Sequence, residues 1–448
     1  MTGKTLNSLK GRLKVPGDKS ISHRALMFSA LTRGTSKISG LSPAEDCQST
    51  ARCLRTLGLK ITADPGADGD SAGRYIVESP GLAALVAPDT VLDAGNSGTT
   101  MRIMSGLVAG RPFKSRLDGD ASLRRRPMSR VLDLLEQMGA EVIYEEVAGE
   151  RPAKKGLAPF AIKGARLTGK RFSLPVASAQ VETALMLAGL QADGETVISV
   201  PSVLRDHTQR MFRFIGVPFD DLSAELGEGS VRVKRLAEPL PPYVAAVPAD
   251  ISSAAFFMVG AACLPGSELV LTDLGMNVGR RLVLDVLLRM GADIQLLNER
   301  EEAGEPIADL RVKYSGRLRG TVISGEEIAA GIDEIPILAL AGALCQGELT
   351  VRGAEELRHK ESDRLAAITR NLRAAGATLS DTTDGFTIEG QATLPGNSQW
   401  ETFEDHRLAM TGLVASVVAR QPLKLTEVDS VKISYPGFQA DLSRLIDN

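Results

Sequence analysis

Residues 15–34 read VPGDKSISHRALMFSALTRG, and this stretch contains the pattern from which the rest of the chain is built. A small polar cluster comes first, and the apolar run after it predicts a helix that is buried on nearly all sides. We expect Ser20 or Ser22 to cap the start of this helix, because serine is a favoured N-cap residue. The helix is expected to end at Gly34, since glycine commonly terminates helices.

Basic residues stand at the start of this helix, where they oppose the partial positive charge of the helix N-terminus. They are Lys19, His23 and Arg24. Each such cation costs about 0.3–1 kcal/mol at that end of a helix. A bound anion would offset this cost, because helix N-termini together with lysine and arginine form phosphate and carboxylate sites. The opening stretch therefore indicates an anion site.

The pattern recurs six times, with copies that begin about 70–80 residues apart. Each copy predicts a strand, an apolar helix, a strand, a more charged helix and a further strand. The copies open with DKSISHR (18–24), GNSGTT (95–100), ASAQ (177–180), DISSA (250–254), DEIPILA (333–339) and EDHRLA (404–409). Two halves of three units are favoured over one solenoid, because 448 residues exceed the usual size of one domain. The predicted boundary is the proline-rich stretch 238–250, and the strand before Asp18 could pair with either half.

The composition excludes several classes of protein. A net charge of −3 with 4% aromatic residues argues against a nucleic-acid-binding protein. No apolar run is long enough for a membrane span, and the N-terminus has no hydrophobic signal segment, so we expect a cytoplasmic protein. The 4 cysteines have no metal-ligand spacing and are expected to be reduced. No motif supports bound ATP, NAD or a catalytic metal.

Other helix starts carry further candidates for an anion site. Gly95 and Gly98 in GNSGTT would let a ligand approach the backbone closely. Taken alone, GNSGTT and ASAQ are typical of caps and turns, whereas LRRRP (123–127), RHKESDR (358–364) and EDHR (404–407) are typical of caps and of solvated or ion-paired surfaces. Their recurrence at equivalent positions favours the functional interpretation, because equivalent helix ends can converge on one cleft.

Seven motifs, in order, resemble those of the EPSP synthase (3-phosphoshikimate 1-carboxyvinyltransferase) family over nearly the whole chain. They are PGDKSISHR, DAGNSGTT, LRRRPM, SAQ, DEIPILA, LRHKESDR and DHRLAM. RPMSR, SAQV and LRDHT are similar to the second class of this family, which includes glyphosate-tolerant members. The resemblance implies an α/β fold, the two-domain inside-out α/β barrel of enolpyruvyl transferases, with three βαβαββ repeats in each domain. It places residues 1–18 and 244–448 in one domain and 19–243 in the other, with a double-stranded hinge near 18–19 and 240–247.

The family transfers the enolpyruvyl group of phosphoenolpyruvate to the 5-hydroxyl of shikimate 3-phosphate, on the shikimate pathway to chorismate and the aromatic amino acids. Both substrates are polyanions, which would explain the cations at helix starts. The resemblance implies contacts to shikimate 3-phosphate from Lys19, Ser20, Arg24, Ser178, Ala179, Gln180, Arg205, Asp333 and Lys360. It implies contacts to phosphoenolpyruvate from Lys19, Asn96, Gly98, Arg126, Gln180, Glu361, Arg364 and Arg407. No cofactor or metal is implied, and the family suggests a monomer.

The chemistry of this reaction indicates which residues would be catalytic. One proton must reach the methylene carbon of phosphoenolpyruvate and another must leave the 5-hydroxyl, before phosphate departs from a tetrahedral intermediate. Two carboxylates in different environments can carry these protons. We assign the carbon proton to Glu361 and the hydroxyl proton to Asp333. Lys360 is expected to assist proton transfer, Lys19 is a further catalytic candidate, and the arginines are expected to stabilise the departing phosphate.

Three positions depart from the family pattern. Many members have a lysine three residues before the proline of the last motif, where this chain has Ile433, with Lys432 one step earlier. Gly98 stands where tolerant second-class members carry alanine. Because glycine leaves room for a ligand longer than phosphoenolpyruvate, we expect inhibition by glyphosate. Ile103 replaces the proline that is common in the first class.

Two alternatives remain open from the sequence. UDP-N-acetylglucosamine enolpyruvyl transferase shares the architecture and the donor, but it usually has a reactive cysteine where this chain has Ala121. A non-catalytic anion-binding repeat protein would not need Asp333 and Glu361 beside its cations. Replacing Glu361 by alanine distinguishes an enzyme from a binding protein. An enzyme would lose turnover while still binding shikimate 3-phosphate, whereas the ligand binding of a binding protein would scarcely change.

Overall fold

The computed structural model describes residues 8–64, 73–147, 153–176, 178–201, 205–325 and 327–446. Its internal contacts divide the chain into two units. Unit 1 contains the residues up to Asp18 together with Pro248–Glu301 and those from Pro306 onward, and unit 2 contains Lys19–Val247 and Glu302–Glu305. The second boundary therefore follows Val247 rather than residue 243, because β13 (Val244–Ala246) pairs in parallel with β2 (Gly34–Ser39) inside unit 2.

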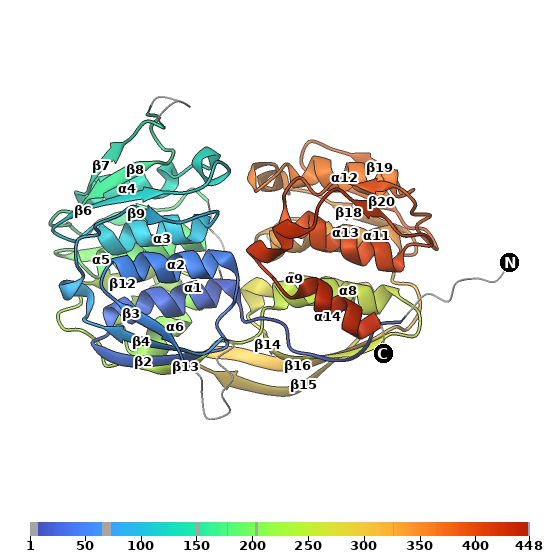
Figure 1. Ribbon diagram of the computed structural model, residues 1–448, viewed down its shortest axis with the longest axis horizontal. Helices are drawn as coiled ribbons and strands as arrows, with labels where there is room; N and C mark the ends of the chain where they lie inside the picture. Colours follow the sequence, from blue (N-terminus) through green and yellow to red (C-terminus); the bar gives the residue numbers. More distant parts are fainter. Residues whose placement is uncertain are drawn as a thin grey trace. The chain divides into compact units, whose positions relative to one another are not determined.

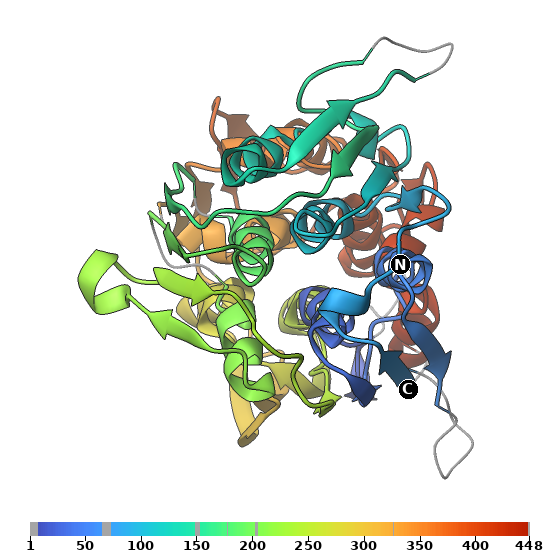
Figure 2. The same ribbon diagram turned by 90° about the vertical axis from the view of Figure 1, so that its left-hand side faces the viewer.

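Three apolar helices form the centre of unit 2, and a second helix follows each of them. The central helices are α1 (Lys19–Phe28), α3 (Gly98–Val108) and α5 (Ala179–Gly189), and the helices that follow are α2 (Glu45–Thr56), α4 (Ser129–Met138) and α6 (His207–Ile215). The central helices are buried almost all round, whereas α4 buries one face, as their apolar patterns predict. Figure 2 faces unit 2 and shows its helices nearly end-on, with the sheets outside them.

Each pair of helices in unit 2 accompanies a four-stranded sheet. The strand orders are β13-β2-β4-β3, β5-β6-β8-β7 and β9-β10-β12-β11. The first two strands of each order pair in parallel and the others pair antiparallel, which is the pairing of a βαβαββ unit. The remaining strands are β3 (Lys60–Ala63), β4 (Tyr75–Ser79), β5 (Leu92–Asp93), β6 (Lys114–Asp118), β7 (Glu141–Tyr144), β8 (Phe160–Lys163), β9 (Arg171–Ser173), β10 (Glu195–Ser199), β11 (Phe219–Asp221) and β12 (Val231–Lys234).

Unit 1 repeats this organisation around its own core (Figure 1). Its central helices are α8 (Ile251–Cys263), α11 (Ile335–Ala343) and α13 (His406–Val418), followed by α9 (Leu282–Arg289), α12 (Arg364–Ala374) and α14 (Phe438–Ile446). Its sheets have the orders β1-β14-β16-β15, β17-β18-β20-β19 and β21-β22. Their strands are β1 (Lys10–Leu13), β14 (Glu268–Gly275), β15 (Asp293–Glu302), β16 (Glu305–Lys313), β17 (Val322–Ile323), β18 (Glu348–Val351), β19 (Thr378–Asp381), β20 (Phe386–Glu389), β21 (Gln399–Trp400) and β22 (Lys424–Leu425).

The opening strand belongs to unit 1. The repeat pattern left open which half it joins, whereas the family resemblance placed residues 1–18 with residues 244–448. β1 pairs in parallel with β14, with Lys10 opposite Glu268 and Leu13 opposite Leu271. Its Leu13 side chain is 2% exposed and lies in the core of that unit. The partner strand lies far along the sequence, so local pattern gave no basis for choosing it.

The predicted ends of the first helix were wrong. α1 begins at Lys19, so Ser20 and Ser22 lie inside the helix and do not cap it. The Ser22 hydroxyl instead accepts a hydrogen bond from the backbone N–H of Ser42 at 2.9 Å. A short 3₁₀ turn ends the helix at Leu31, and Gly34 is the first residue of β2.

Close packing of α3 against α5 depends on a glycine in the last turn of α3. A Cβ atom at Gly106 would overlap the backbone carbonyl of Ala184 on α5. The two helices can therefore approach closely only without a side chain at this position. This packing brings the start of α3 next to the start of α5. In the part of the chain that the structure describes, no helix is long and apolar enough to cross a membrane.

Candidate active site

The N-terminal ends of the three central helices of unit 2 are joined by side-chain hydrogen bonds. Arg24 on α1 donates to the backbone carbonyl of Ala179 on α5 at 3.4 Å. Gln180 on α5 donates through Nε2 to the Thr99 hydroxyl on α3 at 2.9 Å. Within unit 2, the helix starts that carried the candidate residues therefore lie together.

Arg24 is buried at this junction and is held in one orientation. Its side chain donates to the hydroxyls of Thr208 at 2.8 Å and Thr183 at 3.0 Å, and to the carbonyl of Ser20 at 3.1 Å. The residue is 2% exposed. These acceptors orient the guanidinium, and an oriented guanidinium suits a residue that binds an anion.

Lys19 is held at the first turn of α1 by a carboxylate that the sequence analysis missed. Its Nζ lies 3.1 Å from Asp46 Oδ2, on the first turn of α2. The available signal was an acidic residue at a helix start, where the helix dipole favours it. His23, by contrast, is fully buried and bonds Thr50 at 2.7 Å, and Thr50 bonds Thr100 at 2.7 Å. This chain of bonds ties α1, α2 and α3 together, so His23 has a structural role.

Three of the residues predicted to bind phosphoenolpyruvate meet at the start of α3. Arg126 donates to Asn96 twice, to Oδ1 at 2.9 Å and to the backbone carbonyl at 3.3 Å. Asn96 in turn donates to Asp120 Oδ2 at 2.7 Å. Gly98 begins the helix, and a Cβ atom there would lie 3.8 Å from Arg126 Nη1 and 2.9 Å from Arg102 Nη1. The missing side chain therefore keeps the space beside two guanidinium groups open.

Arg102 is a further cation of this group to which the sequence analysis gave no role. It lies one turn after Gly98 on α3 and donates to Gln180 Oε1 at 2.7 Å and to the carbonyl of Pro127 at 3.2 Å. The signal was present in the motif GTTMR, because residues four apart share one face of a helix. Arg102 thus links the predicted phosphoenolpyruvate residue Gly98 with Gln180, which was predicted to contact both substrates.

The remaining predicted residues of unit 2 lie at helix starts. Ser178 caps α5, where its hydroxyl accepts the backbone N–H of Val181 at 3.4 Å. Ser20 lies in the first turn of α1, and Arg205 is half-buried shortly before α6 begins at His207. Helix N-termini supplemented by Lys19, Arg24, Arg102 and Arg126 can hold strongly anionic groups.

A second group of predicted residues surrounds Arg364 in unit 1. The Arg364 side chain is 1% exposed and lies 2.6 Å from Glu361 Oε2 and 3.0 Å from Asp333 Oδ1. Asp405 accepts two further hydrogen bonds from it, at 2.7 and 3.1 Å. Burial opposes the charge of Arg364, but Asp405, Glu361 and Asp333 outweigh that effect and raise its pKa above the ordinary value. Arg364 therefore stays charged at any working pH.

The two predicted acid–base carboxylates of this group are partly exposed, whereas Arg364 is buried. The side chains of Asp333 and Glu361 are 21% and 19% exposed, and Lys360 Nζ lies 3.4 Å from Asp333 Oδ1. Asp333 lies in the turn before α11, and Lys360 and Glu361 lie just before α12. The fold of unit 1 thus brings two carboxylates and a lysine within reach of a ligand.

Arg407, the last predicted residue, is held by two carboxylates to which the sequence analysis gave no role. Asp405 caps α13 and accepts the backbone N–H of Arg407 at 2.9 Å, and Glu334 Oε1 lies 3.3 Å from Arg407 Nη1. The guanidinium also lies 5.9 Å from the centre of the Phe256 ring. Glu334 and Asp405 occur in motifs that we quoted, but their burial and their partners depend on the tertiary structure.

The comparisons with known proteins identify the family. The family model of EPSP synthase (3-phosphoshikimate 1-carboxyvinyltransferase) matches residues 4–442. The chain belongs to the EPSP synthase family. It is 48% identical to the 3-phosphoshikimate 1-carboxyvinyltransferase of Synechococcus sp. RCC307 over 441 residues, which cover 98% of this chain and 97% of that protein. The corresponding enzyme of Desulforudis audaxviator is 47% identical over 437 residues, which cover 98% and 97% of the two chains.

A solved structure supports the fold of this EPSP synthase family member as well. The EPSP synthase of Acinetobacter baumannii superposes with a TM-score of 0.84 at 38% identity, over 98% of this chain and 96% of the other. The predicted resemblance and the predicted two-domain enolpyruvyl transferase fold are therefore confirmed.

Lys432 does not occupy the position at which many EPSP synthases carry a lysine. Its Nζ lies 2.7 Å from Asp429 Oδ1, and the two side chains are 61% and 85% exposed. The pair lies in a 3₁₀ turn of unit 1. Lys432 therefore forms a surface ion pair with a near neighbour in sequence.

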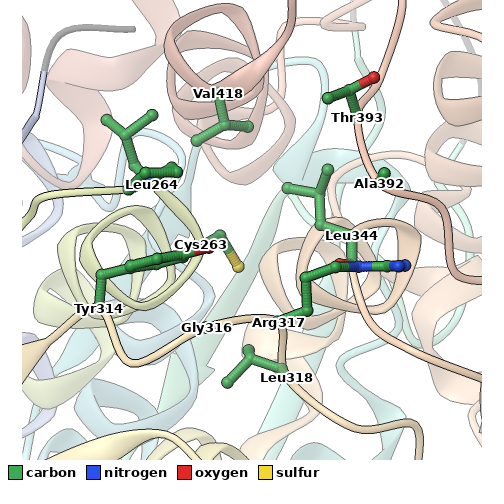
Figure 3. A pocket seen from close by; sticks show the side chains of 11 residues that line it. Cys263, Leu264, Tyr314, Gly316, Arg317, Leu318, Leu344, Ala392, Thr393 and Val418 are labelled. Carbon is green, nitrogen blue, oxygen red and sulfur yellow. The ribbon is translucent and has the colours of Figure 1, made fainter.

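A cavity of about 90 Å³ in unit 1 is separate from both groups of site residues. Figure 3 shows mainly apolar side chains around it, among them Leu264, Leu344 and Val418, with Cys263 and Arg317. Arg317 donates to the backbone carbonyl of Cys345, and burial raises the pKa of Cys263 to about 12. We therefore place the chemistry at the two charged groups and not in this cavity. Within the described ranges, no three His, Cys, Asp or Glu side chains could hold a metal ion together.

Proposed function

We propose that this chain is a 3-phosphoshikimate 1-carboxyvinyltransferase, on the shikimate pathway of aromatic amino-acid biosynthesis. It transfers the enolpyruvyl group of phosphoenolpyruvate to the 5-hydroxyl of shikimate 3-phosphate and releases phosphate. The family match over residues 4–442 supports the reaction class. The observation that carries the chemistry is the gathering of Asp333, Lys360 and Glu361 around the buried Arg364. Arg364 lies 3.0 Å from Asp333 and 2.6 Å from Glu361, and Lys360 lies 3.4 Å from Asp333.

The first helix starts of unit 2 are proposed to bind shikimate 3-phosphate. Arg24 is an oriented cation there, because Thr208, Ser20, Ala179 and Thr183 accept hydrogen bonds from its guanidinium. The other proposed contacts come from Lys19, Ser20, Ser178, Ala179, Gln180 and Arg205, with Asp333 and Lys360 of unit 1. Those of unit 2 lie at or near helix starts, and those of unit 1 are a carboxylate and a lysine. Such groups can form hydrogen bonds or ion pairs with the phosphate, the carboxylate and the ring hydroxyls of the substrate.

Phosphoenolpyruvate is proposed to bind the residues at the start of α3 together with the arginines of unit 1. Arg126 already donates a hydrogen bond to Asn96, and Gly98 leaves the space beside Arg126 open. Lys19, Gln180, Glu361, Arg364 and Arg407 complete the proposed set. Cations that surround the leaving phosphate stabilise the charge that develops on it as the C–O bond breaks.

The two carboxylates are proposed to handle the protons. Asp333 takes the proton of the 5-hydroxyl, and Lys360 at 3.4 Å compensates its charge before the transfer. Glu361 gives a proton to the methylene carbon and later accepts one from the methyl group as phosphate leaves.

The alternatives receive less support. A UDP-N-acetylglucosamine enolpyruvyl transferase would carry its reactive cysteine where this chain has the exposed Ala121, and the curated relatives carry the name of the shikimate enzyme. A non-catalytic anion-binding protein would not need the two solvent-accessible carboxylates beside Lys360. We also propose that the enzyme is a cytoplasmic monomer; its four cysteines are all free, as in a reducing compartment.

Phosphate release tests the proposed function directly. The full chain is mixed with shikimate 3-phosphate and phosphoenolpyruvate, and with each substrate alone, and inorganic phosphate is measured. We expect release only with both substrates, because phosphoenolpyruvate loses its phosphate only after the 5-hydroxyl of shikimate 3-phosphate has added to it. Release from phosphoenolpyruvate alone, or no release from the complete mixture, would exclude the proposed reaction.

A further inference from the structure

Glu182 is a fully buried carboxylate near Arg24, which is proposed to bind the anionic substrate shikimate 3-phosphate. It lies on α5 between Ala179 and Thr183, and both of these residues accept hydrogen bonds from Arg24. Its exposure is 0%. Glu182 stands two residues after the SAQ motif and was not among the predicted site residues.

The hydrogen bonds of Glu182 are incomplete in its ionised form. Gln209 Nε2 on α6 donates to Glu182 Oε1 at 2.7 Å. Among the residues that the structure describes, neither Glu182 Oε2 nor Gln209 Oε1 has a hydrogen-bond partner, and both atoms are buried. A proton on Glu182 turns one of these two surplus acceptors into a donor. Burial of an incompletely bonded charge is costly, so the geometry favours a neutral Glu182.

The charged groups that face Glu182 act in opposite directions. Burial raises the pKa of Glu182 to about 8, and the positive charge of Arg24 from α1 and the hydrogen bond from Gln209 limit that rise. Asp206, just before α6, adds to the rise. Arg24 is thus the cation that favours the ionised form of Glu182.

We propose that Glu182 is a positioning residue for Arg24, and that it must be protonated when shikimate 3-phosphate binds. This inference rests on the proposed function. An ionised Glu182 and an anionic group of the substrate compete for the same guanidinium charge, and the two negative charges repel each other. The proton comes from solvent, so substrate binding takes up a proton at a pH where the free enzyme has lost it.

The expected pH dependence has a definite sign. A phosphate monoester has its second pKa at about 6 and is already dianionic above pH 7. Above about pH 8 the free enzyme must first protonate Glu182, so the KM for shikimate 3-phosphate should rise up to about tenfold for each pH unit. Below that pH, KM should be nearly constant. The pH effect should appear in the KM for shikimate 3-phosphate and not in kcat, because Glu182 acts on substrate binding through Arg24.

Calorimetry of the full chain measures the proton directly. Shikimate 3-phosphate is titrated at about pH 8.5 in two buffers of different ionisation enthalpy, with the wild type and with Glu182→Gln. We expect uptake of up to about one proton by the wild type and none by Glu182→Gln, whose amide imitates the protonated acid. The variant should also lose the rise of KM above pH 8.

Two further variants make the outcome decisive. Glu195→Gln removes an exposed carboxylate of β10 that pairs with Lys234, so its proton uptake should equal that of the wild type. Gln209→Met removes a hydrogen bond that favours ionised Glu182, so the rise of KM should move to higher pH. No uptake by the wild type, or the same pH dependence in Glu182→Gln, would overturn the inference while turnover persists. Absence of both shikimate 3-phosphate binding and turnover would instead overturn the proposed function.

Discussion

Arg364 and Asp405 form a buried bidentate ion pair, with Nε–Oδ2 at 2.7 Å and Nη2–Oδ1 at 3.1 Å. The two side chains are 1% and 0% exposed. Asp405 also accepts the hydroxyl of Ser362 and the backbone N–H of Arg407, at 2.9 Å each. One carboxylate therefore orients both proposed phosphoenolpyruvate arginines of unit 1, Arg364 through its side chain and Arg407 through the helix start.

We predict that Asp405→Asn weakens both stability and catalysis. The change leaves Arg364 buried without its main counter-charge, and loss of one partner of a buried pair costs about 3–5 kcal/mol. Asp333 and Glu361 still neutralise part of the charge, so a value at the low end is expected. The midpoint of urea unfolding measures the stability, and the KM for phosphoenolpyruvate should rise because both arginines lose their orientation.

Asp429→Asn is the matched control for this prediction. It removes one carboxylate of unit 1 from an ion pair whose two side chains are 61% and 85% exposed. Exposed pairs contribute little to stability. Equal unfolding midpoints for the two variants would contradict the importance given to the Arg364–Asp405 pair.

The second prediction concerns the two acid–base carboxylates. Glu361→Ala and Asp333→Asn should each lower kcat by about 10²–10⁴, the usual contribution of a positioned acid or base. Glu361→Ala should still bind shikimate 3-phosphate, because the proposed contacts to that substrate do not include Glu361. Steady-state phosphate release and equilibrium binding distinguish the two effects. Glu355→Ala, an exposed acidic residue in the preceding 3₁₀ turn, is the control and should keep full turnover.

Much of the fold could be predicted because each repeat carries its own local pattern. The apolar stretches that become α1, α3 and α5 are buried all round, and glycine ends the amphipathic helix α4 in the left-handed conformation at Gly139, with φ of 112°. The partner of β1 could not be predicted from local pattern, since it is a strand more than two hundred residues away, and only the family resemblance placed residues 1–18 with the second half of the chain. Ser20 and Ser22 were misplaced because the Ser22 hydroxyl has a tertiary partner, which no local rule contains.

The candidate site could be predicted only where a side chain belongs to a recurrent helix start. Lys19, Asn96 and Gly98 fall in this class. Asp46 and Arg102 were missed because their importance comes from contacts with other helices. Residues such as these look like ordinary parts of an amphipathic or capped helix when the sequence is read alone. The tertiary structure shows that Asp46 pairs with Lys19 and that Arg102 donates to Gln180, and these contacts indicate the roles of Asp46 and Arg102.

The third prediction is that Glu182→Gln changes how stability depends on pH. The pKa of Glu182 is raised from 4.5 to about 8, first by burial, so the folded state keeps a proton that the unfolded chain has lost. Between these values the free energy of unfolding of the wild type falls as pH rises, by at most about 1.4 kcal/mol per pH unit, and then levels off. Glu182→Gln lacks this contribution, so its advantage over the wild type should grow over that interval. Urea unfolding from about pH 5 to about pH 8 measures it, and parallel curves would contradict the prediction.

The last prediction concerns Gly98 and inhibition by glyphosate. We expect glyphosate to inhibit the wild type in competition with phosphoenolpyruvate, because Gly98 leaves open space beside two arginines. In Gly98→Ala the new Cβ would lie 2.9 Å from Arg102 Nη1, so the flexible side chain of Arg102 must move. The same Cβ would lie 3.8 Å from Arg126 Nη1, which is an ordinary contact, so Arg126 can keep its position. Phosphoenolpyruvate would keep its contact with Arg126, whereas a longer ligand would meet the methyl group. The inhibition constant for glyphosate should therefore rise by a larger factor than the KM for phosphoenolpyruvate, and both are obtained from initial rates of phosphate release. Unaltered activity of the wild type at millimolar glyphosate, with phosphoenolpyruvate near its KM, would show that the space beside Gly98 does not admit the inhibitor.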